Sequence, residues 1–137
     1  MIVADASLIS YFAVRDERQS ELADAVCVAD AAWASAWLWR SEVRSTLMKY
    51  VNYSGMSLEM ALLAFNTAEE IIAGREYRVS SEKVFELAVR SKCTAYDCEY
   101  VALAEELGVP LVTADQQLLK AFPKTAVSLE HFSKKKK

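Results

Sequence analysis

The sequence predicts an α/β fold, a three-layer α/β/α domain around a central and mainly parallel sheet. Short apolar runs alternate with longer segments of helical periodicity along the chain. Strands that are separated by helices pair in parallel through right-handed crossovers. The 137 residues, 53% of them hydrophobic, are enough to fill one core. We therefore expect a single domain over residues 1–133, followed by a lysine tail over residues 134–137.

The start of the chain predicts a strand, a turn and a helix. Residues 1–4 form an apolar run that ends at Asp5, and residues 7–12 then form a short helix. Further apolar runs predict strands at residues 31–35, 77–80, 109–113 and 126–129, the last at an edge of the sheet. Periodicity and capping residues predict helices at residues 17–28, 36–53, 57–72, 81–90 and 96–107, and a short helix after Asp115.

Two of these helices carry one apolar stripe each. The first stripe consists of Trp39, Val43, Leu47 and Tyr50. The second consists of Tyr96, Tyr100, Leu103 and Leu107. Gly108 ends the second helix, and Glu42 borders the stripe of the first.

The charge of the chain is more acidic than its net value of −3 suggests. Four of the 16 basic residues form the terminal run over residues 134–137, which leaves 12 basic against 19 acidic residues, a charge of −7. The run is either a solvated tail or an appended sequence, and the appended sequence is favoured. An acidic body argues against broad, unaided binding of nucleic acid. It is compatible with a nuclease whose acidic pocket is neutralised by divalent ions.

The cysteines and the apolar runs indicate a cytoplasmic protein without membrane segments. Cys27, Cys93 and Cys98 form no C-x-x-C pair, which argues against a disulfide framework or structural zinc. Charged residues or glycine interrupt every apolar run before the roughly 20 residues of a membrane span. The start of the chain also lacks the basic region of a signal peptide.

Acidic residues stand where predicted strands end or predicted helices begin. Asp5 and Asp115 follow strands, and the carboxyl ends of parallel strands are where ligands gather in such sheets. Asp97 and Asp115 taken singly are also explained as a first-turn residue and a helix cap. Asp5 follows a strand so apolar that its charge needs a partner or a metal. Glu42 taken alone resembles any solvated helix glutamate.

The segments MIVADAS and TAYDCEYVALAEELGVPLVTAD together resemble the PIN domain, most closely the toxin ribonucleases of VapBC toxin–antitoxin systems. In that family the first strand ends in D-x-S, an internal helix carries a glutamate, T/S-x-Y-D begins a helix, and the next strand ends in T-x-D. The matching residues here are Asp5 with Ser7, Glu42, Thr94 with Asp97, and Thr113 with Asp115. The match is sharp over residues 1–7 and 92–122, and the proline often found before the glutamate helix is absent.

The resemblance implies a metal-dependent endoribonuclease that uses Mg²⁺ or Mn²⁺. Phosphodiester hydrolysis needs an activated water and stabilisation of charge on the leaving oxygen, and carboxylates are fitting ligands for the cations that provide both. Asp5 and Asp97 are the expected direct ligands, Asp115 a ligand or second-metal residue, and Glu42 a water-mediated ligand or orienter of the attacking water. Ser7, Thr94 and Thr113 are expected either to hold these carboxylates by hydrogen bonds or to serve as caps and turn residues.

The resemblance also implies partners. A toxin of this family acts on RNA needed for translation, forms homodimers, and is blocked by a cognate VapB-type antitoxin that wraps an apolar groove. Trp33, Trp37 and Trp39 crowd one segment, and either all pack in the core with one ring partly exposed or one lies at an interface. A non-catalytic PIN-like binding module is the alternative function, which metal titration would distinguish.

Other catalytic classes fit the sequence less well. A phosphorylation receiver domain needs a lysine after a late strand, and Lys120 is misplaced for that role. A haloacid-dehalogenase phosphatase needs D-x-D after the first strand, where this chain has only Asp5. His131 is the lone histidine and lies near the end of the chain, which gives histidine-based schemes little support.

Overall fold

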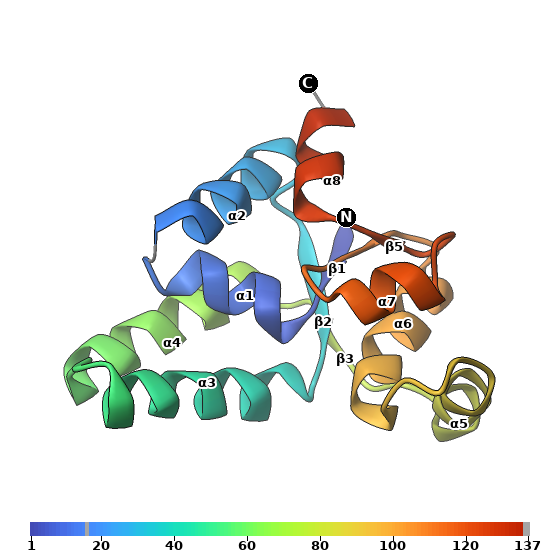
Figure 1. Cartoon of the computed structure of the whole chain (residues 1–137), viewed down its shortest axis with the longest axis horizontal. Coiled ribbons are helices and arrows are strands. Elements are labelled where there is room, and N and C mark those ends of the chain that lie inside the picture. The colour runs from blue at the N-terminus through green and yellow to red at the C-terminus, as the bar shows by residue number, and fades with distance from the viewer. Residues whose placement is uncertain (16, 136–137) are drawn as a thin grey trace.

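The computed structural model describes residues 1–15 and 17–135, which form a three-layer α/β/α arrangement (Figure 1). Its centre is a five-stranded sheet with the order β3-β2-β1-β4-β5, in which every neighbouring pair is parallel. The strands are β1 (Ile2–Ala4), β2 (Trp33–Ala36), β3 (Glu76–Tyr77), β4 (Leu111–Val112) and β5 (Ala126–Val127). The predicted fold class is confirmed.

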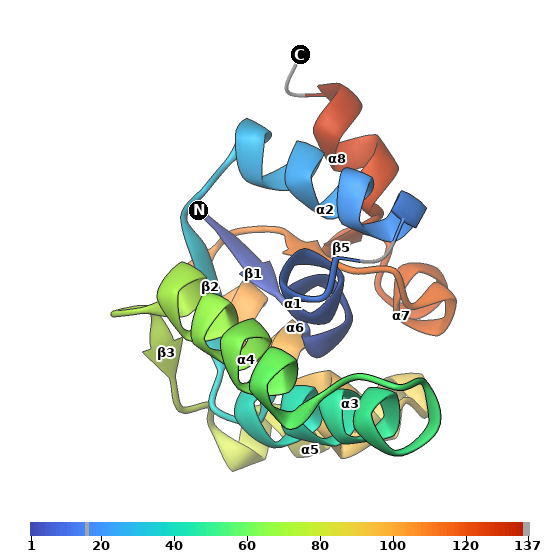
Figure 2. The ribbon, with the colours of Figure 1, turned by 90° about the vertical axis from the view of Figure 1, so that its left-hand side faces the viewer.

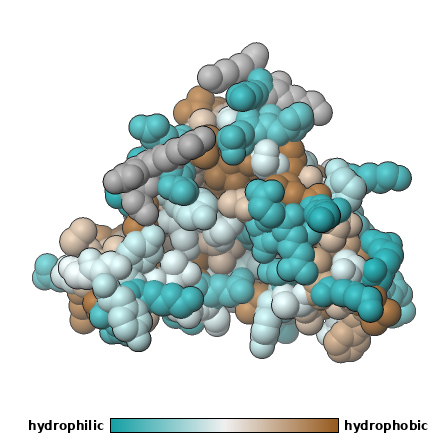
Figure 3. Space-filling model, viewed as in Figure 1, coloured by the Kyte–Doolittle hydropathy of each residue, from teal (hydrophilic) through white to brown (hydrophobic). Residues whose placement is uncertain are grey.

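Helices cover both faces of this sheet. They are α1 (Ala6–Ala13), α2 (Glu17–Ala29), α3 (Trp39–Tyr53), α4 (Leu58–Ile72), α5 (Ser81–Ser91), α6 (Ala95–Leu107), α7 (Gln116–Ala121) and α8 (Leu129–Lys135). Helices α1 to α4 lie on one side of the strands and α5 to α7 on the other (Figure 1). Figure 2 shows α3 and α4 side by side, and α8 against α2. Much of the face drawn in Figure 3 is hydrophilic, with smaller hydrophobic areas between the polar side chains.

The core explains why one predicted helical stripe is incomplete. Tyr100 and Leu103 are buried as expected, but Tyr96 is 62% exposed because it belongs to the first turn of α6. Cys98, Val101 and other residues around the helix are buried as well, since α6 contacts the sheet on one side and α5 on another. A helix that packs on two neighbours buries more than one narrow stripe of its surface.

Several element boundaries differ from the prediction, and at two of them a polar residue caps the helix that follows. Strand β3 stops at Tyr77, and Ser80 accepts a hydrogen bond from the Lys83 amide at the start of α5. Strand β5 stops at Val127, and Ser128 accepts one from the His131 amide in α8, a helix that the sequence pattern did not predict. That helix continues through Lys135, two residues past the expected end of the domain.

The tryptophans occupy different environments. Trp33 and Trp39 are fully buried, whereas Trp37 lies in the turn between β2 and α3 and is 51% exposed. Trp37 and Trp39 therefore do not share a helix, contrary to the prediction. No helix in residues 1–15 and 17–135 has the length and apolar character needed to cross a bilayer.

Candidate active site

A single pocket at the carboxyl ends of β1 and β4 contains the four predicted acids. It has a volume of about 290 Å³ and is lined by Asp5, Ala6, Ser7, Tyr11, Glu42, Asp97, Tyr100, Ala114 and Asp115. Asp5 and Asp115 follow the neighbouring strands β1 and β4. Glu42 and Asp97 lie in the first turns of α3 and α6. Residues that are up to 110 positions apart in the sequence thus meet at the carboxyl edge of the sheet, where parallel sheets bind their ligands.

Asp5 is the most buried of the four acids, at 5% exposure. It caps α1 and accepts hydrogen bonds from the Ser7 hydroxyl at 2.7 Å, the Leu8 amide at 3.1 Å and the Thr113 hydroxyl. Burial raises the pKa of the Asp5 carboxyl above its usual value, the hydrogen bonds oppose that rise, and the charge of Asp115 adds to it. Three donors thus fix this carboxyl beside the pocket.

Thr113 connects the two acids that follow strands. Its buried hydroxyl donates to Asp5 and accepts a hydrogen bond from the Asp115 amide at 3.0 Å. Asp115 Oδ1 accepts from the Gln117 and Leu118 amides at 2.8 and 3.2 Å, which makes Asp115 the N-cap of α7. The two roles expected of these residues, a role in the site and a role as a helix cap, therefore both occur here. Ser7 and Thr113 hold the Asp5 carboxylate, while Asp115 lines the pocket and also caps a helix.

Glu42 is held from the opposite side of the pocket by a residue that sequence reasoning missed. The Tyr100 hydroxyl donates to Glu42 Oε1 at 2.5 Å, and Tyr100 is only 1% exposed. Burial raises the pKa of Glu42, as do the charges of Asp97 and Asp5, whereas the bond from Tyr100 lowers it. The sequence contained a usable signal. Tyr100 stands three positions after Asp97, which puts both on one helical face, and a buried tyrosine hydroxyl requires a partner.

Asp97 faces the same pocket from α6. Thr94 caps this helix, with its hydroxyl accepting the Asp97 amide hydrogen at 3.0 Å, so Thr94 serves as the cap that was one of its two expected roles. Burial and the charge of Asp115 raise the pKa of Asp97, and a hydrogen bond with the Thr94 side chain lowers it. Glu99 does not line the pocket, but burial and the charge of Glu42 raise the pKa of its carboxyl.

The donor set of the pocket suits a hard divalent cation. Four carboxylates surround it, and oxygen ligands are those that Mg²⁺ and Mn²⁺ prefer. Within residues 1–15 and 17–135, no three acidic, histidine or cysteine side chains stand close enough together to form a ready coordination sphere.

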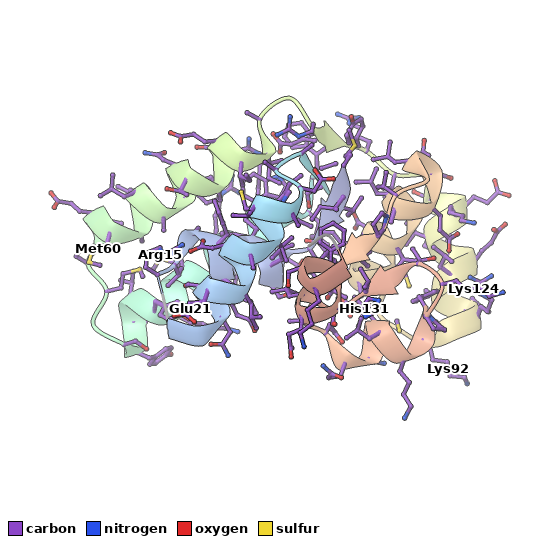
Figure 4. The ribbon with its side chains drawn as sticks, turned by 90° about the horizontal axis from the view of Figure 1, so that it is seen from above. Arg15, Glu21, Met60, Lys92, Lys124 and His131 are labelled. Carbon is purple, nitrogen blue, oxygen red and sulfur yellow. The ribbon has the colours of Figure 1, made fainter. Side chains whose placement is uncertain are left out.

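The remaining reactive side chains lie elsewhere. His131 on α8 (Figure 4) lines a different hollow, beside Met1 and Pro110 at the amino ends of the strands. Cys93 and Cys98 are buried, and the sulfur of Cys98 lies 3.8 Å from the Ser91 hydroxyl. The chemistry available to the pocket is therefore that of carboxylates, two tyrosines and hydroxyls.

Comparison with known proteins adds relatives that share this fold. No protein-family model matches the sequence. The curated protein Ribonuclease VapC3 from Pyrobaculum aerophilum is 35% identical over 130 residues, which cover 89% of this chain and 95% of the relative.

Two solved structures resemble the whole chain. PAE2754 from Pyrobaculum aerophilum matches with a TM-score of 0.74 and 23% identity, over 98% of this chain and 95% of that one. FitAcB from Neisseria gonorrhoeae matches with a TM-score of 0.73 and 14% identity, over 96% of this chain and 99% of that one. At these identities the two structures establish a shared fold.

Proposed function

This chain belongs to the VapC-type ribonucleases of the PIN-domain family, and from that membership we propose that it cuts RNA internally as the toxin of a toxin–antitoxin pair. The observation that supports the proposal most directly is the meeting of Asp5, Glu42, Asp97 and Asp115 in one pocket. These acids come from two strand ends and two helix starts. Helix capping alone gives no reason for all four to converge.

The proposed cofactor is Mg²⁺ or Mn²⁺. When bound, such a cation lowers the pKa of a water and neutralises charge on the phosphate. Asp5 and Asp97 are the proposed direct ligands, and Asp115 is a ligand of the same ion or of a second one. Glu42 orients the attacking water and Tyr100 fixes the position of Glu42. Ser7 and Thr113 keep Asp5 aimed at the pocket.

The biological part of the proposal concerns translation and partners. We propose that the RNA substrate is one needed for translation, that cutting it arrests growth in the cytoplasm, and that a VapB-type antitoxin blocks the pocket. The chain is proposed to form homodimers. The exposed Trp37 is a candidate contact for either assembly, since large exposed aromatic rings are enriched at interfaces.

Cleavage of RNA by purified, antitoxin-free protein tests the proposal. The protein should cut a structured RNA in millimolar Mg²⁺ or Mn²⁺, lose this activity in EDTA, and regain it when the cation is added back. Asp5→Asn should be inactive. Asp24→Asn is the matched control, because Asp24 lies on α2 in an exposed ion pair with Arg15.

Two results would contradict parts of the proposal. Cleavage that continues unchanged in EDTA would exclude the metal-dependent mechanism. Binding of RNA without cleavage under any of these conditions would favour a non-catalytic binding module.

A further inference from the structure

A second hollow adjoins the carboxylate pocket. It has a volume of about 290 Å³ and is lined by Tyr11, Gln19, Leu22, Thr113, Ala114, Gln116, Leu119, Ser128, Leu129 and Glu130. Three of these, Tyr11, Thr113 and Ala114, lie at the boundary between the two spaces. Tyr11 and Ala114 line both, and the Thr113 hydroxyl bonds to Asp5. The lining comes from α1, α2, α7 and α8 and from the segments that follow β4 and β5. A ligand that occupies the carboxylate pocket can therefore extend directly into this adjoining hollow.

The lining of the adjoining hollow is apolar at its base and polar at its rim. Leu22, Leu119 and Leu129 are partly or fully buried, whereas Gln19 and Gln116 are exposed. Glu130 is the single charged residue among the described lining residues, and no lysine, arginine or histidine is among them. Among these described residues, a phosphate would meet a carboxylate and no cation.

A nucleobase matches this lining better than a phosphate does. Single-stranded RNA is recognised by stacking of bases on aromatic rings and by hydrogen bonds to their edges. Tyr11 supplies a half-buried ring at the entrance from the carboxylate pocket. Glutamine can pair with the edge of adenine, and a glutamate carboxylate accepts from an exocyclic amino group. Uracil is the one RNA base that has no amino group.

We propose that the adjoining hollow is a subsite for the nucleotide next to the scissile phosphate. In it the base stacks on Tyr11, its edge meets Gln19 and Gln116, and Glu130 favours bases with an amino group over uracil. This inference rests on the proposed ribonuclease function, because it takes an RNA strand as the occupant of the carboxylate pocket. It adds a base preference to that function.

The test measures binding in EDTA, where no metal-dependent cleavage competes. Fluorescent single-stranded oligonucleotides with one varied base are titrated with the parent protein and its variants. Tyr11→Ala should bind about 5- to 100-fold more weakly, the range seen when a stacking aromatic ring is removed. Tyr11→Phe should retain most of the affinity because it keeps the ring. Tyr53→Ala is the matched control, since Tyr53 is 84% exposed at the end of α3 and lines neither space.

Variants at the rim test base preference without touching the core. Glu130→Gln should reduce the preference for amino-bearing bases over uracil, both in affinity and in the bases found next to the cleavage site. The ratio between oligonucleotides is the useful readout, because removal of a negative charge raises affinity for every RNA alike. Gln116→Ala should lower affinity, whereas Gln117→Ala, whose residue is exposed and outside both linings, should not.

The outcomes separate this inference from the ribonuclease proposal. If the parent protein cuts RNA while Tyr11→Ala keeps the parent's affinity and Glu130→Gln keeps its base preference, the subsite is refuted and the nuclease stands. If the parent binds oligonucleotides with the expected preference but never cuts them, the hollow binds a base, and both the nuclease and the place of this base beside a scissile phosphate are refuted. Loosened binding of an antitoxin protein with unchanged RNA binding would also refute the subsite. Thermal melts check that Tyr11→Ala is folded, and the two rim variants decide the matter if it is not.

Discussion

The two sides of the carboxylate pocket are held in different ways. On the Asp5 side, which comprises Asp5, Ser7, Thr113 and Asp115, backbone amides and hydroxyls at the ends of adjacent strands fix the acids. On the Glu42 side, which comprises Glu42, Asp97 and Tyr100, the acids stand on α3 and α6. Within the described residues, Glu42 accepts one side-chain hydrogen bond, from Tyr100. Several hydrogen bonds therefore fix each carboxylate on the Asp5 side, whereas the position of Glu42 depends on how α3 and α6 pack against each other.

The largest expected effect is the loss of function in Asp5→Asn. We expect activity to fall on the order of 1000-fold, because several kcal/mol of charge stabilisation depends on a cation that Asp5 helps to hold. The measurement is the rate of RNA cleavage in Mg²⁺. Expression of the parent chain alone should also arrest growth, and expression of Asp5→Asn should not.

Two controls accompany this prediction. Asp24→Asn should remain as toxic as the parent, because Asp24 lies in an exposed ion pair on α2. Co-expression of the adjacent small gene should relieve the arrest caused by the parent. If Asp5→Asn arrests growth as strongly as the parent does, Asp5 does not carry the chemistry.

The same contrast between the two sides governs what the sequence could predict. Asp5 and Asp115 were predictable because each directly follows an apolar strand, and parallel strands bring their carboxyl ends to one edge. The capping role of Asp115 follows from local sequence as well. These are relations within a few residues of the chain, and local pattern captures them.

The Glu42 side was less accessible to sequence reasoning. Its geometry depends on the packing of α3 and α6, whose hydrogen-bonded residues Glu42 and Tyr100 are 58 positions apart. Tyr100 looked like one more apolar residue of a stripe, because periodicity reports burial and gives no information on hydroxyl partners. Local pattern also failed to predict the helix α8, because its first turn adjoins a short edge strand and its end is a run of lysines.

Tyr100→Phe should have the second largest effect. Removal of one hydroxyl leaves Glu42 without its hydrogen bond from α6, and loss of a residue that orients a catalytic carboxylate typically lowers activity by about 10- to 100-fold. We expect the loss in kcat and little change in KM. Tyr53→Phe removes a hydroxyl from an exposed tyrosine and should leave both constants unchanged. An equal change in the two variants would show that Tyr100 has no positioning role.

Ser7→Ala should reduce activity less than Tyr100→Phe, although it removes a hydroxyl of the same kind. Asp5 keeps its bonds from the Leu8 amide and from Thr113 when Ser7 is truncated. The loss of one hydrogen bond of ordinary strength corresponds to roughly a 2- to 10-fold slower reaction. Cleavage rates of the two variants, measured side by side, give the comparison. A greater loss in Ser7→Ala would reverse our ranking of the two sides.

Metal-free protein should melt at a higher temperature as the pH falls from 7 towards the ordinary carboxyl pKa of about 4. Burial raises the pKa values of Asp5, Glu42 and Asp97 in the folded state, so the folded protein binds protons more readily than the unfolded chain in this window. Stability contributed by Asp24 and Glu76, whose pKa values are lowered by arginines, is lost only below the window. Melts in EDTA between pH 7 and 5 measure the effect. A melting temperature that falls steadily as the pH is lowered over this range would show that the pKa values of these acids are not raised in the folded protein.

The smallest expected effect is that of Asp97→Asn on stability, since this variant neutralises only one of the three acids whose pKa values are raised by burial. In EDTA at pH 7 the variant should melt a few degrees above the parent, which corresponds to about 1 kcal/mol or less for a half-exposed group. Asn removes the repulsion between Asp97 and the charges of Asp115 and Glu42. It also removes the favourable interaction of an acid with the start of α6, worth about 0.3 to 1 kcal/mol, so the gain is a difference between opposing terms.

The direction of the Mg²⁺ effect separates the two roles of Asp97. A ligand of the cation predicts that millimolar Mg²⁺ raises the melting temperature of the parent more than that of the variant, because an ion bound only by the folded state stabilises it by mass action. A plain first-turn residue predicts a variant that melts no higher than the parent and an equal response to Mg²⁺.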